Sequence, residues 1–233
     1  MSKKLFVNIA SLGLLQLANY VFPFLTVPYL SRVLSTSHYG LILFSLSFTT
    51  YFAILCDYGF GLTGTKAVAT NANQPEQLNR LVSNITVIKS ALFVFSLILN
   101  LIIVFSYGQF REYWFIYAIN IFTLINSIFF PTWFFQGMER MKYITLVQVA
   151  VRSLAVVLIL CIVKHDSDYY LWPVINLLTT IIGVIIVQYF LFRNFNLRYV
   201  KPYGQSIKRE LSVGWHVFNS TVALSMDPIS TSF

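Results

Sequence analysis

The stretch that decides the fold is residues 5–31, LFVNIASLGLLQLANYVFPFLTVPYLS, which contains no Asp, Glu, Lys or Arg. A helix needs about 20 mostly apolar residues to cross the hydrocarbon core of a bilayer. Similar runs, interrupted by at most one charge, follow at about 39–65, 81–107, 113–138, 143–163 and 169–192. Because they are apolar on every side and do not alternate, they predict helices and not the strands of a barrel.

The composition of the whole chain agrees with six membrane spans. Hydrophobic residues make up 57% of the 233 residues and charged residues 10%, whereas a soluble domain carries about 25% charged residues. These values exclude a water-soluble domain and a disordered chain. The predicted fold class is all-α, a polytopic helical bundle with six transmembrane helices and a partial seventh.

Two parts of the chain are expected to differ in character. Residues 1–210 form the predicted six-helix lobe, and residues 211–233 an incomplete seventh helix. The tail after Ser225 contains Asp227 and Pro228, which are unfavourable within a span.

The net charge of +8 does not indicate a nucleic-acid partner, because the cations lie between apolar runs and not on one face. Most of them flank the span ends that share a side with the N-terminus: Lys3, Lys4, Lys66, Arg80, Arg140, Lys142, Arg193, Arg198, Lys201, Lys208 and Arg209. The other side has Arg32, Arg111 and Lys164. Cytoplasmic loops are enriched in Lys and Arg, so the N-terminus is predicted to be cytoplasmic.

Three ionisable residues fall inside predicted spans: Asp57, Lys89 and Arg152. At 1.5 Å per residue, all three lie roughly 13–15 Å from the basic helix ends, which predicts a polar cavity at one level. Asp57 and Lys89, on consecutive helices, either form a structural ion pair or take part in transport, with Asp57 as a candidate proton carrier. Arg152 has no acidic residue at its level except Asp57, and it is predicted to bind an anion such as phosphate.

Uncharged polar residues in the spans are weaker candidates, since such groups usually hydrogen-bond neighbouring helices; a few could line the cavity. They are Gln16, Asn19, Asn84, Asn100, Asn120, Asn126, Gln148 and Asn176. Pro23 and Pro28 predict either a static bend or a hinge in the first span. The histidines and cysteines lack metal-ligand spacing, and no phosphate-binding glycine loop or nucleophile motif is present, so no cofactor, metal or catalytic residue is predicted.

Four segments, in order along the chain, resemble the Wzx-type O-antigen flippases, which are polysaccharide transporters of the MOP superfamily. The most specific is PTWFFQGMERM at 131–141, which resembles a family signature through Trp133, Gln136, Gly137 and Glu139. The others are PYLSRVL at 28–34, DYGFGLTGT at 57–65 and GWHVF at 214–218. The glycines of the segment at 57–65 also predict close helix packing.

The resemblance implies a transporter in the bacterial inner membrane. It would move undecaprenyl-diphosphate-linked oligosaccharide repeat units from the cytoplasmic to the periplasmic leaflet by alternating access. The implied partners are this lipid, the bilayer and other polysaccharide-assembly proteins. Arg152, Lys89 and Arg32 are the cations expected to contact the diphosphate.

Family members have two such lobes, so the chain is expected to be a truncated first lobe; a half-size protein that dimerises is the alternative. Three other functions remain open from the sequence. One is a small-molecule or cation exporter of a related MOP branch, whose cavity should favour acidic groups. Another is a membrane enzyme such as a polyprenyl-sugar transferase, and the third is an inactive remnant.

Overall fold

A computed structural model describes residues 3–202 and 204–226, and the predicted tail from Asp227 onward lies outside them. The helices are α1 (Lys3–Val33), α2 (Thr36–Asp57), α3 (Phe60–Thr70), α4 (Pro75–Ser106), α5 (Gly108–Glu112), α6 (Trp114–Phe122), α7 (Ile125–Phe129), α8 (Thr132–Gly137), α9 (Met141–Ile162), the 3₁₀ helix η1 (Asp166–Tyr170), α10 (Leu171–Asn194) and α11 (Gly204–Met226). Within these residues six helical segments are long and apolar enough to cross a membrane, which confirms the predicted all-α class.

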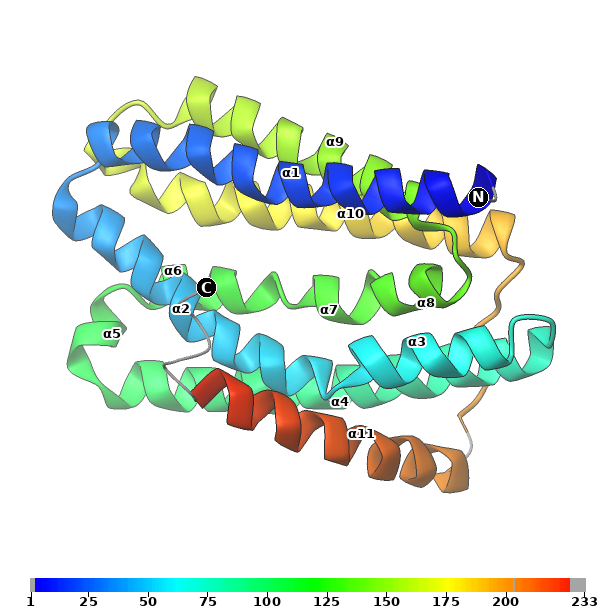
Figure 1. Ribbon diagram of the computed structural model, residues 1–233. Helices are drawn as coiled ribbons and strands as arrows, with labels where there is room; N and C mark the ends of the chain where they lie inside the picture. Colours follow the sequence, from blue (N-terminus) through cyan, green and yellow to red (C-terminus); the bar gives the residue numbers. More distant parts are fainter. Residues whose placement is uncertain (1–2, 203, 227–233) are drawn as a thin grey trace.

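The segments lie side by side in a bundle (Figure 1). Helices α1, α9 and α10 form one layer, α2, α3, α4 and α11 form another, and α6, α7 and α8 run between the two layers. The N-terminus, the α3–α4 loop, the α8–α9 link and the chain between α10 and α11 all lie at one end. We call this the basic end, because the eleven cations flanking the N-terminal side lie in these segments or in the helix ends that adjoin them.

The second span is interrupted in its middle, where one continuous helix was expected. Tyr58 and Gly59 have φ angles of +50° and +78°, which end α2 and redirect the chain into α3. A left-handed pair is well suited to glycine and costly for tyrosine. The break comes directly after Asp57, whose Oδ2 accepts the Gly61 N–H at 3.3 Å and so caps the first turn of α3.

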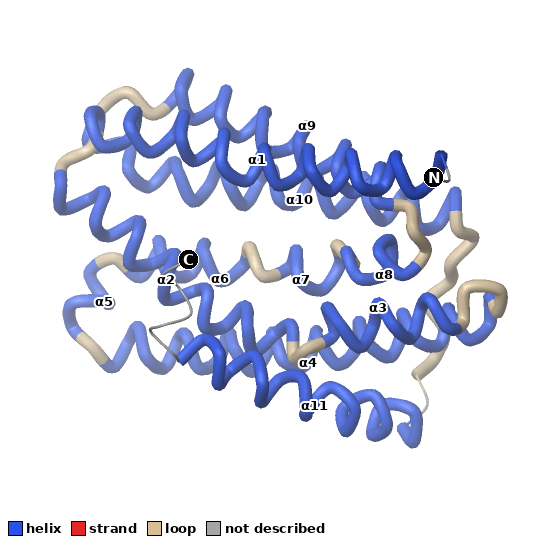
Figure 2. Tube along the Cα trace, in the orientation of Figure 1, coloured by secondary structure: helices blue, strands red, loops and turns tan. Residues whose placement is uncertain are grey.

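The fourth span, predicted as one helix, consists of three short ones (Figure 2). Between α6 and α7 the Thr123 and Leu124 N–H groups bond three residues back, at 3.0 and 3.1 Å, which is 3₁₀ geometry. Between α7 and α8, Pro131 has no N–H to offer the Ser127 carbonyl four residues earlier. Hydropathy alone does not register such interruptions, because the residues around them are apolar.

Helix α1 runs parallel to α9 and is attached to it by hydrogen bonds along its length. Thr145 Oγ1 donates to the Ser11 carbonyl at 3.0 Å, and Tyr29 Oη to the Val163 carbonyl at 2.8 Å. Polar contacts of this kind join helices where lipid removes the hydrophobic driving force. Helix α1 remains continuous through its two internal prolines.

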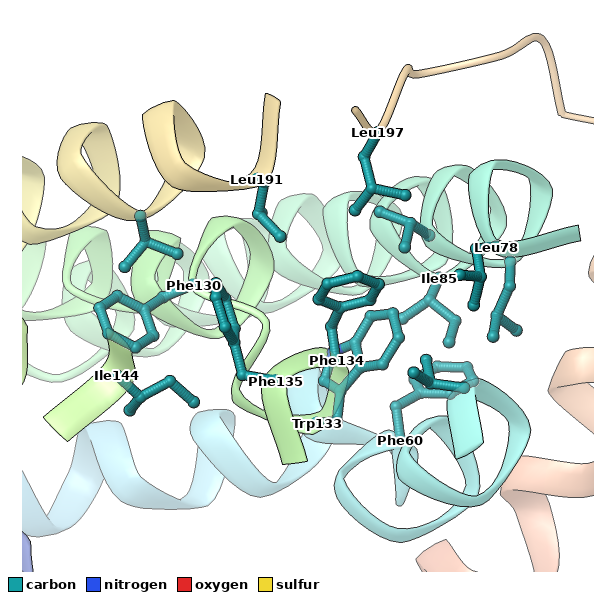
Figure 3. Close-up of a cluster of buried hydrophobic side chains, with 14 of the residues drawn as sticks. Phe60, Leu78, Ile85, Phe130, Trp133, Phe134, Phe135, Ile144, Leu191 and Leu197 are labelled. Carbon is teal, nitrogen blue, oxygen red and sulfur yellow. The ribbon is translucent and has the colours of Figure 1, made fainter. Parts of the chain in front are cut away.

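The largest buried cluster joins α3, α4, α8 and α10 around aromatic side chains of the signature segment (Figure 3). Its close approach depends on glycines. A Cβ atom at Gly64 would lie 2.9 Å from the Trp133 ring, and one at Gly137 would lie 2.6 Å from Val68 Cβ and 2.7 Å from the Thr65 carbonyl oxygen. The glycines therefore let α3 and α8 touch with almost no space between them.

We predict that Gly137→Ala destabilises the protein by about 1–3 kcal/mol, because the added methyl meets backbone as well as a side chain. The control is Gly40→Ala in α2, where nothing lies within 4 Å of the added Cβ and helix propensity improves by up to about 1 kcal/mol. Unfolding in mixed detergent micelles measures both. Equal stability of the two variants would contradict the packing account.

Candidate functional site

Lys89 lies in the middle of α4 and joins the two interrupted spans. Its side chain is 2% exposed, and its Nζ lies 2.8 Å from Asp57 Oδ1 at the break in the second span. The same Nζ donates to the Ser127 carbonyl at 3.2 Å, which is the carbonyl that Pro131 leaves without a helix partner. One ammonium group thus satisfies a carboxylate and an orphaned backbone oxygen at once.

The ion pair that the sequence left as one of two alternatives is therefore formed. Lys89 has protein partners on two sides, and its burial leaves it no open face. Asp57 differs, because its side chain is 45% exposed. An anion contact by Lys89 and a proton-carrying role for Asp57 remain predictions.

Arg152 occupies a separate, polar pocket of 190 Å³ in the middle of α9. Its Nη1 donates to Asn19 Oδ1 of α1, and no carboxylate among the described residues lies within ion-pair distance of it. The other polar side chains around the pocket come from three helices: Asn126 of α7, Gln148 of α9, and Asn176, Thr179 and Thr180 of α10.

This pocket suits a ligand rich in oxygen. A guanidinium carries five N–H donors, and the structure uses one of them within the protein. Amide side chains both donate and accept, which matches sugar hydroxyls as well as phosphate oxygens. A pocket of 190 Å³ has room for a phosphate group or part of a sugar.

The three cations predicted as substrate contacts are not brought together. Helix α7 lies between Lys89 and the Arg152 pocket, since Ser127 bonds Lys89 while the adjacent Asn126 lines the pocket. Arg32 is exposed in the last turn of α1, at the end of the bundle opposite the basic end. Only Arg152 among the three lines a pocket within the spans.

The i, i+4 spacing of polar residues within α9 and α10 could have identified the amides of the pocket from the sequence. Gln148 and Arg152 are four residues apart on α9, and Asn176 and Thr180 are four apart on α10, so each pair shares one face. No group of three or more His, Cys, Asp or Glu side chains that could hold a metal ion occurs in the described part of the chain.

The signature residues have structural positions. Trp133 is 2% exposed in the large cluster, and Gln136 Oε1 accepts the Thr65 hydroxyl at 3.2 Å, which joins α8 to α3. Gly137 provides the close contact described above.

Glu139 ends the signature helix with a left-handed residue at φ +53°. Its N–H bonds the Gln136 carbonyl at 3.0 Å, and the Arg140 N–H bonds the Phe135 carbonyl at 2.9 Å, which together form a Schellman motif. The Glu139 carbonyl in turn accepts from Asn8 Nδ2 at 2.9 Å. The signature thus fixes the link between α8 and α9 and anchors α1 to it.

Comparison with known proteins identifies the family to which the chain belongs. The sequence profile described as "Polysaccharide biosynthesis protein" matches residues 5–227. A protein of Escherichia coli strain K12 named "Putative O-antigen transporter" is 27% identical over 219 residues, which cover 94% of this chain and 53% of that protein. A protein of the same name from Shigella dysenteriae is 29% identical over 225 residues, which cover 94% and 55%. The chain spans about half the length of these relatives, and no solved structure matches it.

We predict an asymmetry within the Asp57–Lys89 pair. Asp57→Asn leaves a buried ammonium without its counter-charge and should lower the free energy of unfolding by about 3–5 kcal/mol. Lys89→Met leaves a half-exposed carboxylate and an orphaned carbonyl, at a smaller cost of about 1–3 kcal/mol.

The double variant should recover most of the loss caused by Asp57→Asn, because no buried charge remains. Detergent unfolding of all four proteins completes the cycle. Additive losses would show that the two side chains act independently.

Proposed function

Since this chain belongs to the family of polysaccharide biosynthesis proteins, we propose that it is part of a transporter for lipid-linked oligosaccharides. It is a multi-pass membrane protein, and we place its basic end in the cytoplasm of a bacterial inner membrane, because Lys and Arg mark the cytoplasmic side. The substrate is an undecaprenyl-diphosphate-linked O-antigen unit that passes to the periplasmic leaflet by alternating access.

The observation that carries this proposal is the Arg152 pocket. A charged residue in the middle of a span is costly and marks a ligand pathway unless it is paired. Arg152 has a single amide partner and faces a hollow lined by further amides. Neutral amides and one cation together favour a ligand that combines sugar hydroxyls with negative charge.

The same pocket argues against an exporter of small cations. Such a protein needs acidic groups in its cavity, and the lining of the Arg152 pocket contains none. Among the described residues, no group of three or more His, Cys, Asp or Glu side chains could hold a metal ion for a metal-dependent membrane transferase. The Arg152 pocket therefore gives a transport role the better support.

Photo-cross-linking in cells tests the proposal without requiring a complete transport cycle. Benzoylphenylalanine in place of Gln148 lies in the pocket, whereas the same group in place of Leu146 lies on an exposed face of α9, where Leu146 is 68% exposed. In cells that make lipid-linked O-antigen, we expect a glycan-bearing adduct at position 148 and not at 146, detected with an O-antigen antibody.

Arg152→Gln should reduce this adduct by about tenfold or more, since a charge-assisted contact is lost. Arg152→Lys should retain part of it, because the charge stays but the planar fork does not. Arg111→Gln, at an exposed position outside the pocket, is the control. Equal adducts at positions 146 and 148, or an adduct indifferent to Arg152→Gln, would overturn the proposal.

A further inference from the structure

A second and larger polar hollow lies at the basic end, outside the membrane-middle pocket. One part, of 710 Å³, lies between α3, α4 and α11, and an adjoining part, of 630 Å³, extends along the first turns of α4 to the chain before α11. Arg80, Asn84 and Ser206 line both parts, so we treat them as one groove.

The charges along this groove are mainly positive. Lys66 of α3, Arg80 of α4, Lys201 and Arg209 line it, against the carboxylates Glu76 and Glu210. Of the four cations only Arg209 has a carboxylate within 4 Å, namely Glu210 at 3.9 Å, among the residues that the structure describes. Burial raises the pKa of Glu210, and Arg209 acts in the opposite direction.

Asn84 points to a ligand independently of the charges. Its side chain is 3% exposed and lines both parts of the groove, yet its amide has no hydrogen-bond partner among the described residues. The Asn84 amide is not among the fully buried side-chain atoms that lack a partner, so its polar atoms are open to whatever occupies the groove. An amide N–H₂ beside unpaired cations is well placed to donate to an anionic oxygen.

The groove also changes character along its length. Near the basic end its lining is charged and polar, whereas Leu62, Val213 and Val217 line its part between α3 and α11. Val217 packs against Gly59 at the break of the second span, so this apolar part reaches toward the middle of the bundle. A polar part that continues into an open apolar part matches the head and tail of a lipid.

We propose that this groove is a binding site for the diphosphate group of a membrane lipid, with Asn84, Lys66, Arg80 and Arg209 as its ligands. The site precedes the Arg152 pocket on the path from the basic end. The choice of a diphosphate rests on the proposed function, whereas the groove itself does not. Because its walls belong to α3, α4 and α11, a bound diphosphate joins the first six-helix lobe to the helix that follows it.

Calorimetric titration of the purified full chain tests this proposal. The chain carries Arg152→Gln, so that the membrane-middle pocket does not contribute, and the probes are inorganic pyrophosphate and farnesyl diphosphate. Lys66→Gln combined with Arg209→Gln should weaken binding of both probes by about tenfold or more. Lys142→Gln combined with Arg193→Gln removes two cations from the same end but outside the groove lining, and should leave binding unchanged.

Two further variants separate ligand contact from misfolding. Asn84→Asp keeps the side-chain size and should weaken binding by adding negative charge where the diphosphate lies. Glu210→Gln removes negative charge and should tighten binding, a gain that a damaged fold does not produce.

The two probes distinguish the sources of the diphosphate. Tighter binding of farnesyl diphosphate supports the lipid site, while equal binding of both probes would overturn the lipid assignment in favour of a soluble diphosphate. Absence of binding, or equal losses in the groove and control variants, would overturn the site altogether. Because the cross-linking at position 148 measures the proposed function separately, either conclusion can fail alone.

Discussion

The ammonium group of Lys89 is the contact on which the middle of this bundle depends. Two spans that would otherwise be continuous helices are interrupted at membrane depth, one after Asp57 and one before Pro131. Each interruption leaves a charge or a backbone oxygen that lipid cannot solvate. Lys89 binds both, and these two partners compensate for the burial of its own charge.

The spans and the charges inside them could be predicted from hydropathy, whereas the interruptions of the helices were not predicted. Hydropathy located six helices correctly because membrane thickness sets their length. It could not separate α6, α7 and α8, since apolar residues continue through both breaks. Pro131, with Ser127 four residues before it, was the available signal for the break between α7 and α8. Asp57 followed by glycines was the signal for the break between α2 and α3.

The two candidate sites differ in how far they could be predicted from the sequence. Arg152 stood out because a lone charge in a span is rare, and the amides around it follow helical spacing. The groove at the basic end was hidden, because its cations come from loops and helix ends far apart in the chain, where the sequence indicates only a side of the membrane. In the sequence, Asn84 does not differ from the other polar residues of the spans. Only the structure shows that its side chain lines the groove without a hydrogen-bond partner in the described part of the chain.

The parallel packing of α1 on α9 has a consequence for biosynthesis. Residues that hydrogen-bond across this interface are separated by 131 to 134 positions along the chain. A ribosome therefore releases α1 long before α9 exists, and during that interval the face of α1 that later packs on α9 has no such partner. Apolar side chains such as Phe6, Leu17 and Phe24 are exposed on the finished bundle. Because these side chains are compatible with lipid, α1 can remain inserted in the bilayer until α9 is synthesised.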